Sequence, residues 1–499
     1  MNDREEETTM RTLHIRKIRF LKSSLSALFA ILLLGGCAVG PDFKRPSPDV
    51  PQQWMGAQAG PGQENGSASA ALASWWLTFN DPALNSLIER GIKSNLDLKI
   101  AGQRIRQSRA ALSGASSGLW PGLDANARYQ RSGTHLPSDS DGLSGADSGS
   151  GSRNLYRSGF DSSWELDIFG GVRRGIEAAE AEVQASVESG RDVLVSLVSE
   201  IGIEYIQLRG LQEQLRITRE NLQLQERSAE ITKKRFDAGF ASALDVANAV
   251  AQVAGTRAQI PSQEASIRQA IYRLGLLLGE NPAALVGELS PEKPLPSLPA
   301  RIIPDLPSNL LERRPDIRMA EERFHAATAK IGVAKADLFP RFFLTGSASL
   351  QANALESWSS SITRLWAVGP SVSWNIFNGG LTRSRIEANR ALAEQSLLEY
   401  RKTILTALQE VESALLAFDK EAQRQASLQE AVESNRRAVD LAERLYVSGQ
   451  NDFLSVLVSQ RSLYASQAEL ARSMDRNATN LISLYKALGG GWETGQKAE

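Results

Sequence analysis

The chain has one cysteine, Cys37, and it stands where a thiol could accept a lipid. A basic N-terminal segment precedes an apolar run, residues 24–34, that is too short to span a bilayer. The run ends in Leu34-Gly35-Gly36-Cys37, and small residues just before a cysteine are typical of the cleavage box of bacterial lipoproteins. We therefore predict that residues 1–36 are a signal peptide and that Cys37 becomes the lipidated first residue of the mature chain. The alternative is an ordinary signal peptide with an incidental cysteine.

The residue after Cys37 bears on the destination of the chain. Ala38 stands there, in place of the aspartate that tends to hold lipoproteins at the inner membrane. This pattern favours the outer membrane. Because one acyl chain binds a membrane only weakly, we expect a second attachment to the membrane.

Other residues that could do chemistry are few. The three histidines, His14, His135 and His325, belong to no nucleophile–histidine–acid set, and no glycine-rich phosphate loop follows a strand. A single cysteine excludes a multi-cysteine metal site. The segment Arg313-Arg314-Pro315-Asp316 indicates a helix start, with proline in the first turn and an acid beside the positive dipole end. We predict no enzyme, no metal and no cofactor beyond the lipid. The net charge of −1 argues against a nucleic-acid-binding surface.

The elements that carry these residues form two halves on one plan. Ile176-Glu177-Ala178 returns as Ile386-Glu387-Ala388, an offset of 386 − 176 = 210 residues. Farther upstream, Asn95-Leu96-Asp97-Leu98 corresponds to Arg314-Pro315-Asp316-Ile317 at an offset of 314 − 95 = 219 residues. We predict a helix, two strands, a long helix and a returning helix in each half.

Each predicted long helix has an apolar residue at almost every seventh position. A sustained seven-residue repeat indicates a left-handed coiled-coil seam, and a helix over 172–237 would be roughly 100 Å long. The second helix is expected over 381–447. The repeat positions are Val187, Leu194, Ile201, Leu208, Leu215, Leu222, Ala229 and Phe236, and then Leu397, Ile404, Val411, Phe418, Gln425, Val432, Val439 and Tyr446.

Glycines mark both ends of each long helix. At the far end, Gly239 and Gly449 favour the left-handed conformation that terminates helices. Ser242-x-x-Asp245 then predicts a capping box for the returning helix, and Asn451 or Asp452 can cap its counterpart. At the near end, two glycine pairs allow the change of path from strand to helix. These strand–helix junctions are Gly170-Gly171 and Gly379-Gly380.

Four segments alternate between apolar and small polar residues, as transmembrane β-barrel strands do. A half-buried soluble sheet is the alternative for any one of them. Four strands cannot close a barrel, and open edges are not tolerated in lipid, so other copies must complete it. Three copies would supply about twelve strands. The predicted strands cover residues 123–131, 159–169, 341–351 and 366–376.

Several motifs together make the chain resemble the TolC-like outer-membrane efflux channel family, in the lipoprotein branch paired with resistance-nodulation-division pumps. The resemblance covers essentially the whole mature chain. It implies a mainly α-helical homotrimer, in which a 12-stranded β-barrel continues into a long coiled-coil tunnel across the periplasm. It also implies a periplasmic adaptor and an inner-membrane pump as partners. The motifs are Trp75-Trp76-x-x-Phe79-x-Asp81-Pro82, Asn95-Leu96-Asp97-Leu98, Leu310-Leu311-Glu312-Arg313-Arg314-Pro315-Asp316-Ile317, Phe377-Asn378-Gly379-Gly380 and Tyr446-x-x-Gly449.

In the family the periplasmic tips form an iris, often closed by acidic rings and polar links between helices. Asp245 matches a commonly acidic or polar gate position. Relatives often carry aspartate six or nine residues past the second tip glycine, where this chain has Ser455 and Val458. That departure puts the usual acidic ring in doubt. The candidate tip residues are Gly239, Asp245, Gly449, Asp452, Ser455 and Val458.

The resemblance favours a passive trimeric duct that exports drugs or other small molecules. A structural or adhesive coiled-coil lipoprotein without a pore is the alternative, which the heptads fit and the alternating strands do not. The expected organisation is a signal peptide (1–36), an extended lipid-anchored segment (37–85), a first repeat (86–280), a proline-rich equatorial linker (281–308), a second repeat (309–488) and a tail (489–499), with returning helices over 242–279 and 452–488.

Overall fold

A computed structural model describes most of the chain. The described residues are 38–47, 50–55, 72–133, 152–296, 298, 307–354 and 362–493. The predicted signal peptide, Cys37, His135 and part of the proline-rich linker lie outside them. The chain divides into two compact units. We call one the sheet unit (Met1–Arg45, Ser108–Val183 and Glu322–Leu397) and the other the helical unit (Pro46–Gln107, Gln184–Glu321 and Leu398–Glu499).

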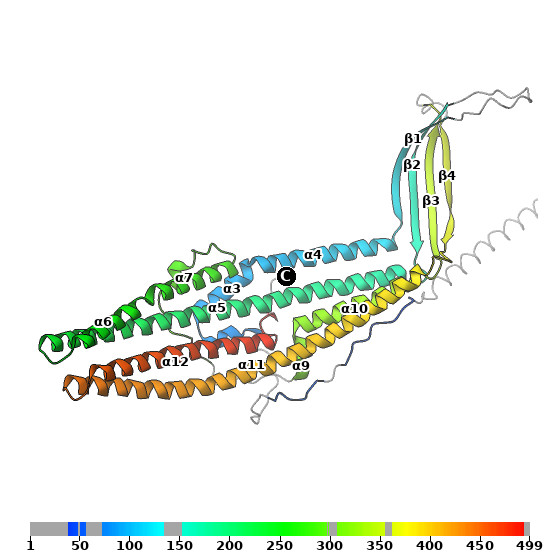
Figure 1. Cartoon of the computed structure of the whole chain (residues 1–499). Helices are drawn as coiled ribbons and strands as arrows, with labels where there is room; N and C mark the ends of the chain where they lie inside the picture. Colours follow the sequence, from blue (N-terminus) through cyan, green and yellow to red (C-terminus); the bar gives the residue numbers. More distant parts are fainter. Residues whose placement is uncertain are drawn as a thin grey trace, which may run out of the picture. The chain divides into compact units, whose positions relative to one another are not determined.

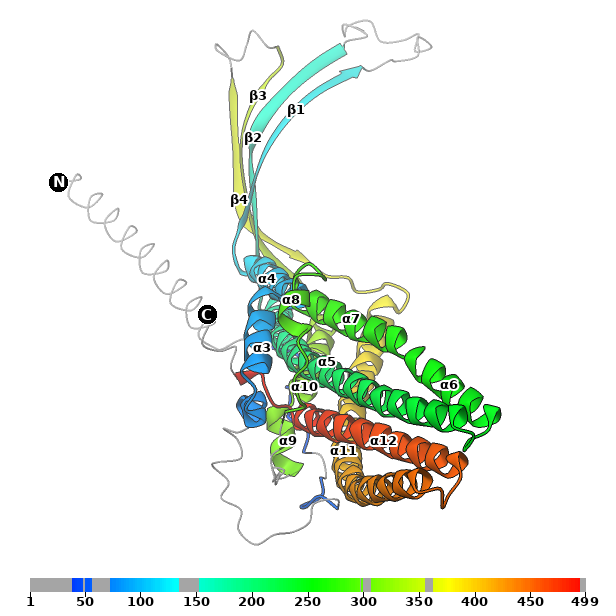
Figure 2. The same ribbon diagram turned by 90° about the vertical axis from the view of Figure 1, so that its left-hand side faces the viewer.

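The sheet unit contains one four-stranded antiparallel sheet, and its strands curve side by side (Figure 2). Each strand pairs with the next along the chain, so that β1 and β4 form the two edges. Neither edge has a strand partner among the described residues. The strands are β1 (Gly122–Gly133), β2 (Ser152–Leu166), β3 (Arg341–Ala352) and β4 (Thr363–Ser373).

Two strand predictions run too far. The strands expected over 159–169 and 366–376 end at Leu166 and Ser373, and β2 begins earlier, at Ser152. Strand β2 stops because the Asp167 carboxylate turns to accept hydrogen bonds from two N–H groups of the next helix, at 2.9 and 3.1 Å. Helix capping therefore ends the strand at this position.

Helices α5 (Gly171–Asp237) and α11 (Leu381–Val447) match the two predicted long helices within one residue. In the helical unit, α6 (Ala243–Arg257) and α7 (Ile260–Leu277) return along α5, and α12 (Phe453–Ala487) returns along α11 (Figure 1). The molecule is mainly α-helical, as predicted. Among the described residues, no helix combines the length and apolar character needed to cross a bilayer.

The first returning helix was predicted to be continuous over 242–279, and this is wrong. It breaks into α6 and α7, because Pro261 has no N–H to bond the carbonyl of Arg257. A tight turn replaces the missing bond, in which the Gln259 N–H donates to Thr256 O at 3.1 Å. The second half has no proline in this region, and α12 is unbroken.

The helices before the strands also differ from the prediction, because each is two helices. Asn95 separates α3 (Pro82–Ser94) from α4 (Leu96–Ser116). Arg314 separates α9 (Pro307–Arg313) from α10 (Pro315–Ala336), which confirms the helix start indicated by Arg313-Arg314-Pro315-Asp316 but adds a short helix before it. The breaks lie at equivalent positions of the two repeats, which indicates that both are built into the shared plan.

The segment 37–85 was predicted to be extended, and its end is not. Residues Trp75–Phe79 form a 3₁₀ helix, and α3 begins at Pro82. The Asp81 carboxylate caps α3 by accepting from Ala83 N–H at 2.8 Å. Burial of Trp75 and Phe79, which are 0% and 1% exposed, fixes this end of the segment in the helical unit.

Candidate functional sites at the helix tips and the strand–helix junctions

Both long helices end in the same glycine turn. Gly239 and Gly449 have φ angles of +81° and +78°, which side chains with a Cβ rarely adopt. The next residue closes each turn, with Phe240 N–H donating to Arg235 O and Gln450 N–H donating to Leu445 O. The predicted helix ends are therefore confirmed, and each hairpin has an exposed turn at its tip.

The acidic tip residues cap the returning helices. Asp245 and Ser242 form the predicted capping box, with the Asp245 carboxylate accepting from Ser242 N–H at 2.9 Å. Asp452 caps α12 by accepting from Ser455 N–H at 3.1 Å. Hydrogen bonds from Ser455, first through its hydroxyl and then through its N–H, lower the pKa of Asp452. The Val458 side chain is exposed and apolar.

The lower part of α5 buries a stripe of polar residues that the sequence analysis overlooked. They are spaced three and four residues apart, as a coiled-coil seam would be, so this spacing of polar side chains could have revealed them. We call this stripe the polar seam. Its members are Thr218, Asn221, Gln225, Ser228 and Thr232, each at most 8% exposed.

Polar contacts join the first hairpin to the second across this seam. Gln460 of α12 donates to Ser228 Oγ of α5 at 2.8 Å across the seam, and it also donates to Glu443 of α11 within its own hairpin at 2.9 Å. Near the tips, the Arg235 guanidinium donates to Val447 O at 2.9 Å and lies 4.8 Å from the centre of the Tyr446 ring. These contacts hold the lower parts of the two hairpins together.

The two strand–helix junctions share one side-chain contact. The Trp164 indole N–H donates to Leu119 O at 2.9 Å, and the Trp374 indole N–H donates to Leu338 O at 3.1 Å. The offsets of 374 − 164 = 210 and 338 − 119 = 219 residues are those of the repeat. Each tryptophan therefore ties the end of the strand that leads into a long helix to the turn after the helix that precedes the strands.

The junction glycines do not all act alike. Gly170, Gly379 and Gly380 have positive φ angles of +77°, +63° and +91°. Gly171 is instead the first residue of α5, where a Cβ would come 3.0 Å from Ala336 Cβ. The first junction thus turns at one glycine and uses the second for close packing, whereas the second junction turns at both.

A short N-terminal strap, residues 38–43, lies against the first junction. Val39 N–H donates to Phe169 O at 3.0 Å, and a Cβ on Gly170 would come 2.6 Å from Ala38 Cα. Asp42 pairs with the buried Arg174 at 2.5 Å. The strap ends at Phe43, whose ring stacks on His325 at 4.3 Å. His325 also lies 3.1 Å from the Glu177 carboxylate through its Nε2.

Comparisons with known proteins match most of the chain to one family. The family model for "Outer membrane efflux protein" matches residues 87–280 and 306–490. The chain is 36% identical to the pyoverdine export outer membrane protein OpmQ of Pseudomonas aeruginosa, over 94% of this chain and 97% of the relative. It is 32% identical to nodulation protein T of Rhizobium leguminosarum bv. trifolii, over 94% and 98%.

Solved channel structures have the same fold. The outer-membrane channel OprN superposes with a TM-score of 0.83 and 34% identity, covering 92% of this chain and 100% of OprN. The open state of the MtrE outer-membrane channel of Neisseria gonorrhoeae gives a TM-score of 0.75 and 26% identity, covering 91% and 99%.

Proposed function

The chain belongs to the outer membrane efflux protein family, and from this premise we propose that it is the passive, trimeric exit duct of a tripartite efflux system. The observation that carries the proposal is the open sheet. Among the described residues of the single chain, β1 and β4 are unpaired edges, and exposed edges are not tolerated in lipid. Three chains joined edge to edge would form a closed barrel of about twelve strands.

The partners follow from this role. A passive duct performs no bond chemistry, so the driving energy must come from an inner-membrane pump of the resistance-nodulation-division type, joined through a periplasmic adaptor. The exposed hairpin tips are the surface that we assign to the adaptor. Relatives are named for pyoverdine export and for toluene efflux, and we propose drugs or other small molecules as the cargo of this chain.

We propose that the mature chain is lipid-anchored at Cys37. The strap supports this, because it holds Ala38, the next residue, against the strand–helix junction in the sheet unit. The lipid would then attach to the residue next to the one that packs on this junction. Mass spectrometry of the purified N-terminal peptide tests the proposal: the lipid mass should be present, and a peptide that begins elsewhere than Cys37 would overturn it.

The contacts across the polar seam are our candidates for the lock of the resting channel. Arg235→Ala and Gln460→Ala each remove a link between hairpins, so we expect higher basal conductance in planar bilayers, by about tenfold if one charge-assisted hydrogen bond is lost. Lys233→Ala is the matched control, because it removes an exposed cation two residues from Arg235.

The outcomes separate two claims. Trimers that conduct only when these links are cut would support both the duct and the lock. Wild-type conductance in Arg235→Ala and Gln460→Ala would reject the lock and leave the duct standing. A protein that forms neither trimers nor conducting channels in any variant would reject the duct.

A further inference from the structure

The two returning helices end at joints of the same design. Helix α7 ends against Asn95, where the amide N–H donates to Leu277 O at 2.8 Å. Helix α12 ends against Arg314, whose guanidinium donates to Ala487 O at 2.9 Å. The offsets, 314 − 95 = 219 and 487 − 277 = 210 residues, are those of the repeat. The joints are therefore equivalent positions occupied by different residues.

Backbone geometry is shared by both joints. Each returning helix ends at a glycine with positive φ, +67° at Gly279 and +70° at Gly489. At both ends the glycine N–H donates to a carbonyl three residues back at 2.9 Å. Because the backbone is the same, the comparison isolates the chemistry of the side chains.

The second joint is ionic. Arg314 is 7% exposed, pairs with Asp316 at 2.7 Å and pairs with Glu410 of α11 at 2.7 Å. Burial lowers the pKa of Arg314, but hydrogen bonds and charges from Asp316 and Glu410 outweigh that effect, and the pKa is raised. Arg314 therefore stays charged, and the end of α12 is held by a cation that two acids keep in place.

The first joint has the acids without the cation. Asp97 and Glu200 occupy the positions equivalent to Asp316 and Glu410, by offsets of 316 − 97 = 219 and 410 − 200 = 210 residues. Both are exposed, and the joint residue is the neutral Asn95, only 3% exposed. An amide hydrogen bond does not depend on ionic strength as an ion pair does.

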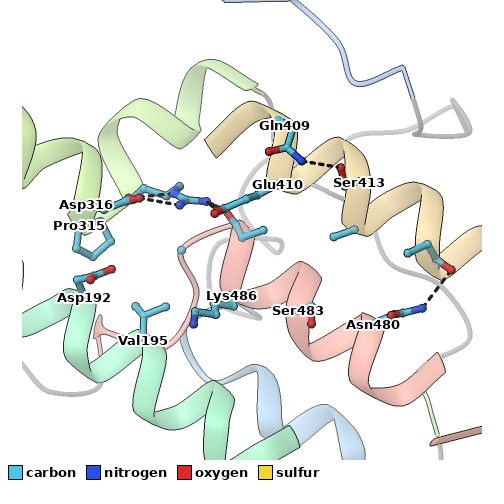
Figure 3. A pocket seen from close by; sticks show the side chains of 15 residues that line it. Asp192, Val195, Pro315, Asp316, Gln409, Glu410, Ser413, Asn480, Ser483 and Lys486 are labelled. Atoms are coloured by element: carbon cyan, nitrogen blue, oxygen red, sulfur yellow. Dashed lines mark hydrogen bonds and ion pairs between the residues drawn. The ribbon is translucent and has the colours of Figure 1, made fainter. Parts of the chain in front are cut away.

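Water and ions can reach the ionic joint. A cavity of about 570 Å³ in the helical unit is lined by Arg314 and Asp316, and Figure 3 shows Asp192, Glu410 and Lys486 around it. Three acids and two cations give this cavity a net charge of −1. Loss of Arg314 would leave the three acids facing one another across the cavity with only Lys486 to balance them.

We propose that Arg314 is a positioning residue that fixes the base of the α11–α12 hairpin by charge, whereas Asn95 fixes the base of the first hairpin without charge. Salt then loosens the end of α12 on α10 and leaves the end of α7 on α4 unchanged. For channel opening, the tip of the α11–α12 hairpin is then the one that responds to salt. This consequence rests on the proposed channel function.

Hydrogen exchange of the purified protein tests the inference without a conductance measurement. The reporters are the N–H groups of Gly489 and Gly490 at the ionic joint and of Gly279 and Glu280 at the neutral one. When the Debye length falls from about 30 Å to about 3 Å, we expect exchange to rise about threefold at the ionic joint, where partly buried pairs are screened in part, and not to change at the neutral joint.

Reciprocal substitutions separate charge from simple structural support. Arg314→Asn installs the residue of the first joint and should abolish the salt dependence at Gly489 and Gly490. Asn95→Arg should create salt dependence at Gly279, because Asp97 and Glu200 are in place. Arg323→Gln is the control, because it removes an exposed cation from the same helix α10. Should Arg314→Asn fail to fold, Glu410→Gln keeps the arginine and should reduce the salt dependence.

Equal salt dependence at the two joints, or salt dependence that survives in both Arg314→Asn and Glu410→Gln, would overturn the inference. Such a result in a protein that conducts normally would leave the proposed function intact. Unequal salt dependence in a protein that never conducts would support the joint and count against the duct.

Discussion

At the residue scale, one buried carboxyl group carries a prediction about pH. The Asp475 side chain packs on Gly210, where a Cβ would come 3.0 Å from Asp475 Oδ1. That oxygen is buried and has no hydrogen-bond partner among the described residues. Burial raises the pKa of Asp475 from 3.8 to about 6, against a smaller lowering by Arg476. Folding therefore favours the neutral form of this carboxyl group relative to the unfolded chain.

The sign of the pH effect follows from this raised pKa. The contribution of protonated Asp475 to the free energy of unfolding is fully present below the pKa of the unfolded chain, near 4, and is lost as pH rises through about 6. The free energy of unfolding of Asp475→Asn should exceed that of wild type by up to about 3 kcal/mol at neutral pH, and the two should be equal near pH 4. Thermal unfolding at several pH values measures the difference. Asp237→Asn, at an exposed site in α5, is the control. A constant difference between Asp475→Asn and wild type at every pH would contradict the assignment.

A second residue-scale prediction concerns the strap. Gly170 has φ +77° and leaves no room for a Cβ beside Ala38, so Gly170→Val should dislodge residues 38–43. We expect a loss of about 1–3 kcal/mol in stability, from backbone strain and overpacking together. Limited proteolysis near Arg45 should then become faster. Gly379→Val is the informative comparison, because it also has positive φ, but no atom lies within 4 Å of its Cβ position. Equal proteolysis of both variants would show that the strap does not depend on Gly170.

At the element scale, the local signals in the sequence predicted the long helices and their tips. Heptads and glycine turns act within a few residues, and α5 and α11 accordingly match their predicted bounds within one residue. The start of α10 at Pro315 was predicted from its local proline and aspartate, whereas the break at Asn95 was missed because its cause is distant, with the acceptor carbonyl 182 residues away. The strap was missed for the same reason, since Asp42 and Arg174 are 132 residues apart.

The polar seam shows a different limit of the sequence. The heptad pattern consists of apolar residues, and Ile201, Leu208 and Leu215 are indeed buried. Below them the buried positions become polar, while Phe236, the last apolar heptad residue, is 43% exposed. A pattern of hydrophobicity alone cannot detect a seam that is held by hydrogen bonds, so the candidate lock was found only from the geometry.

Helix capping at the first tip gives the element-scale prediction. The Ser242 hydroxyl accepts from Asp245 N–H at 3.1 Å, so Ser242→Ala should cost about 1 kcal/mol. The first turn of α6 should then fray, and hydrogen exchange at Asp245 N–H should speed up about fivefold. Ser266→Ala in α7 is the control, because its hydroxyl bonds only a carbonyl within the helix. Unchanged exchange at Asp245 would mean that the carboxylate alone holds the cap.

At the scale of the whole molecule, the sheet predicts how chains assemble. Within one chain, each strand from β1 to β4 pairs with the next, and Phe160 lies opposite Ala348 near the centre of the β2–β3 pair. Among the described strands, the free edge of β4 can therefore pair with the free edge of β1 in another chain. Apolar side chains on β4 are exposed in the single chain, with Trp366 at 79% and Val368 at 69%. Closure between chains would cover these edges and leave outward-facing apolar side chains to the lipid.

Cysteine cross-linking in membranes tests this closure. We expect Ala127→Cys in β1 to link to single cysteines placed along β4 of another chain, giving a ladder on denaturing gels that ends at three chains. A Phe160→Cys, Ala348→Cys pair should link only within one chain, because these residues face each other in the β2–β3 register. A ladder that stops at two chains would leave only about eight strands, and one that passes three would require a wider barrel. Either result would reject the trimer, because the ladder counts the chains that close the barrel.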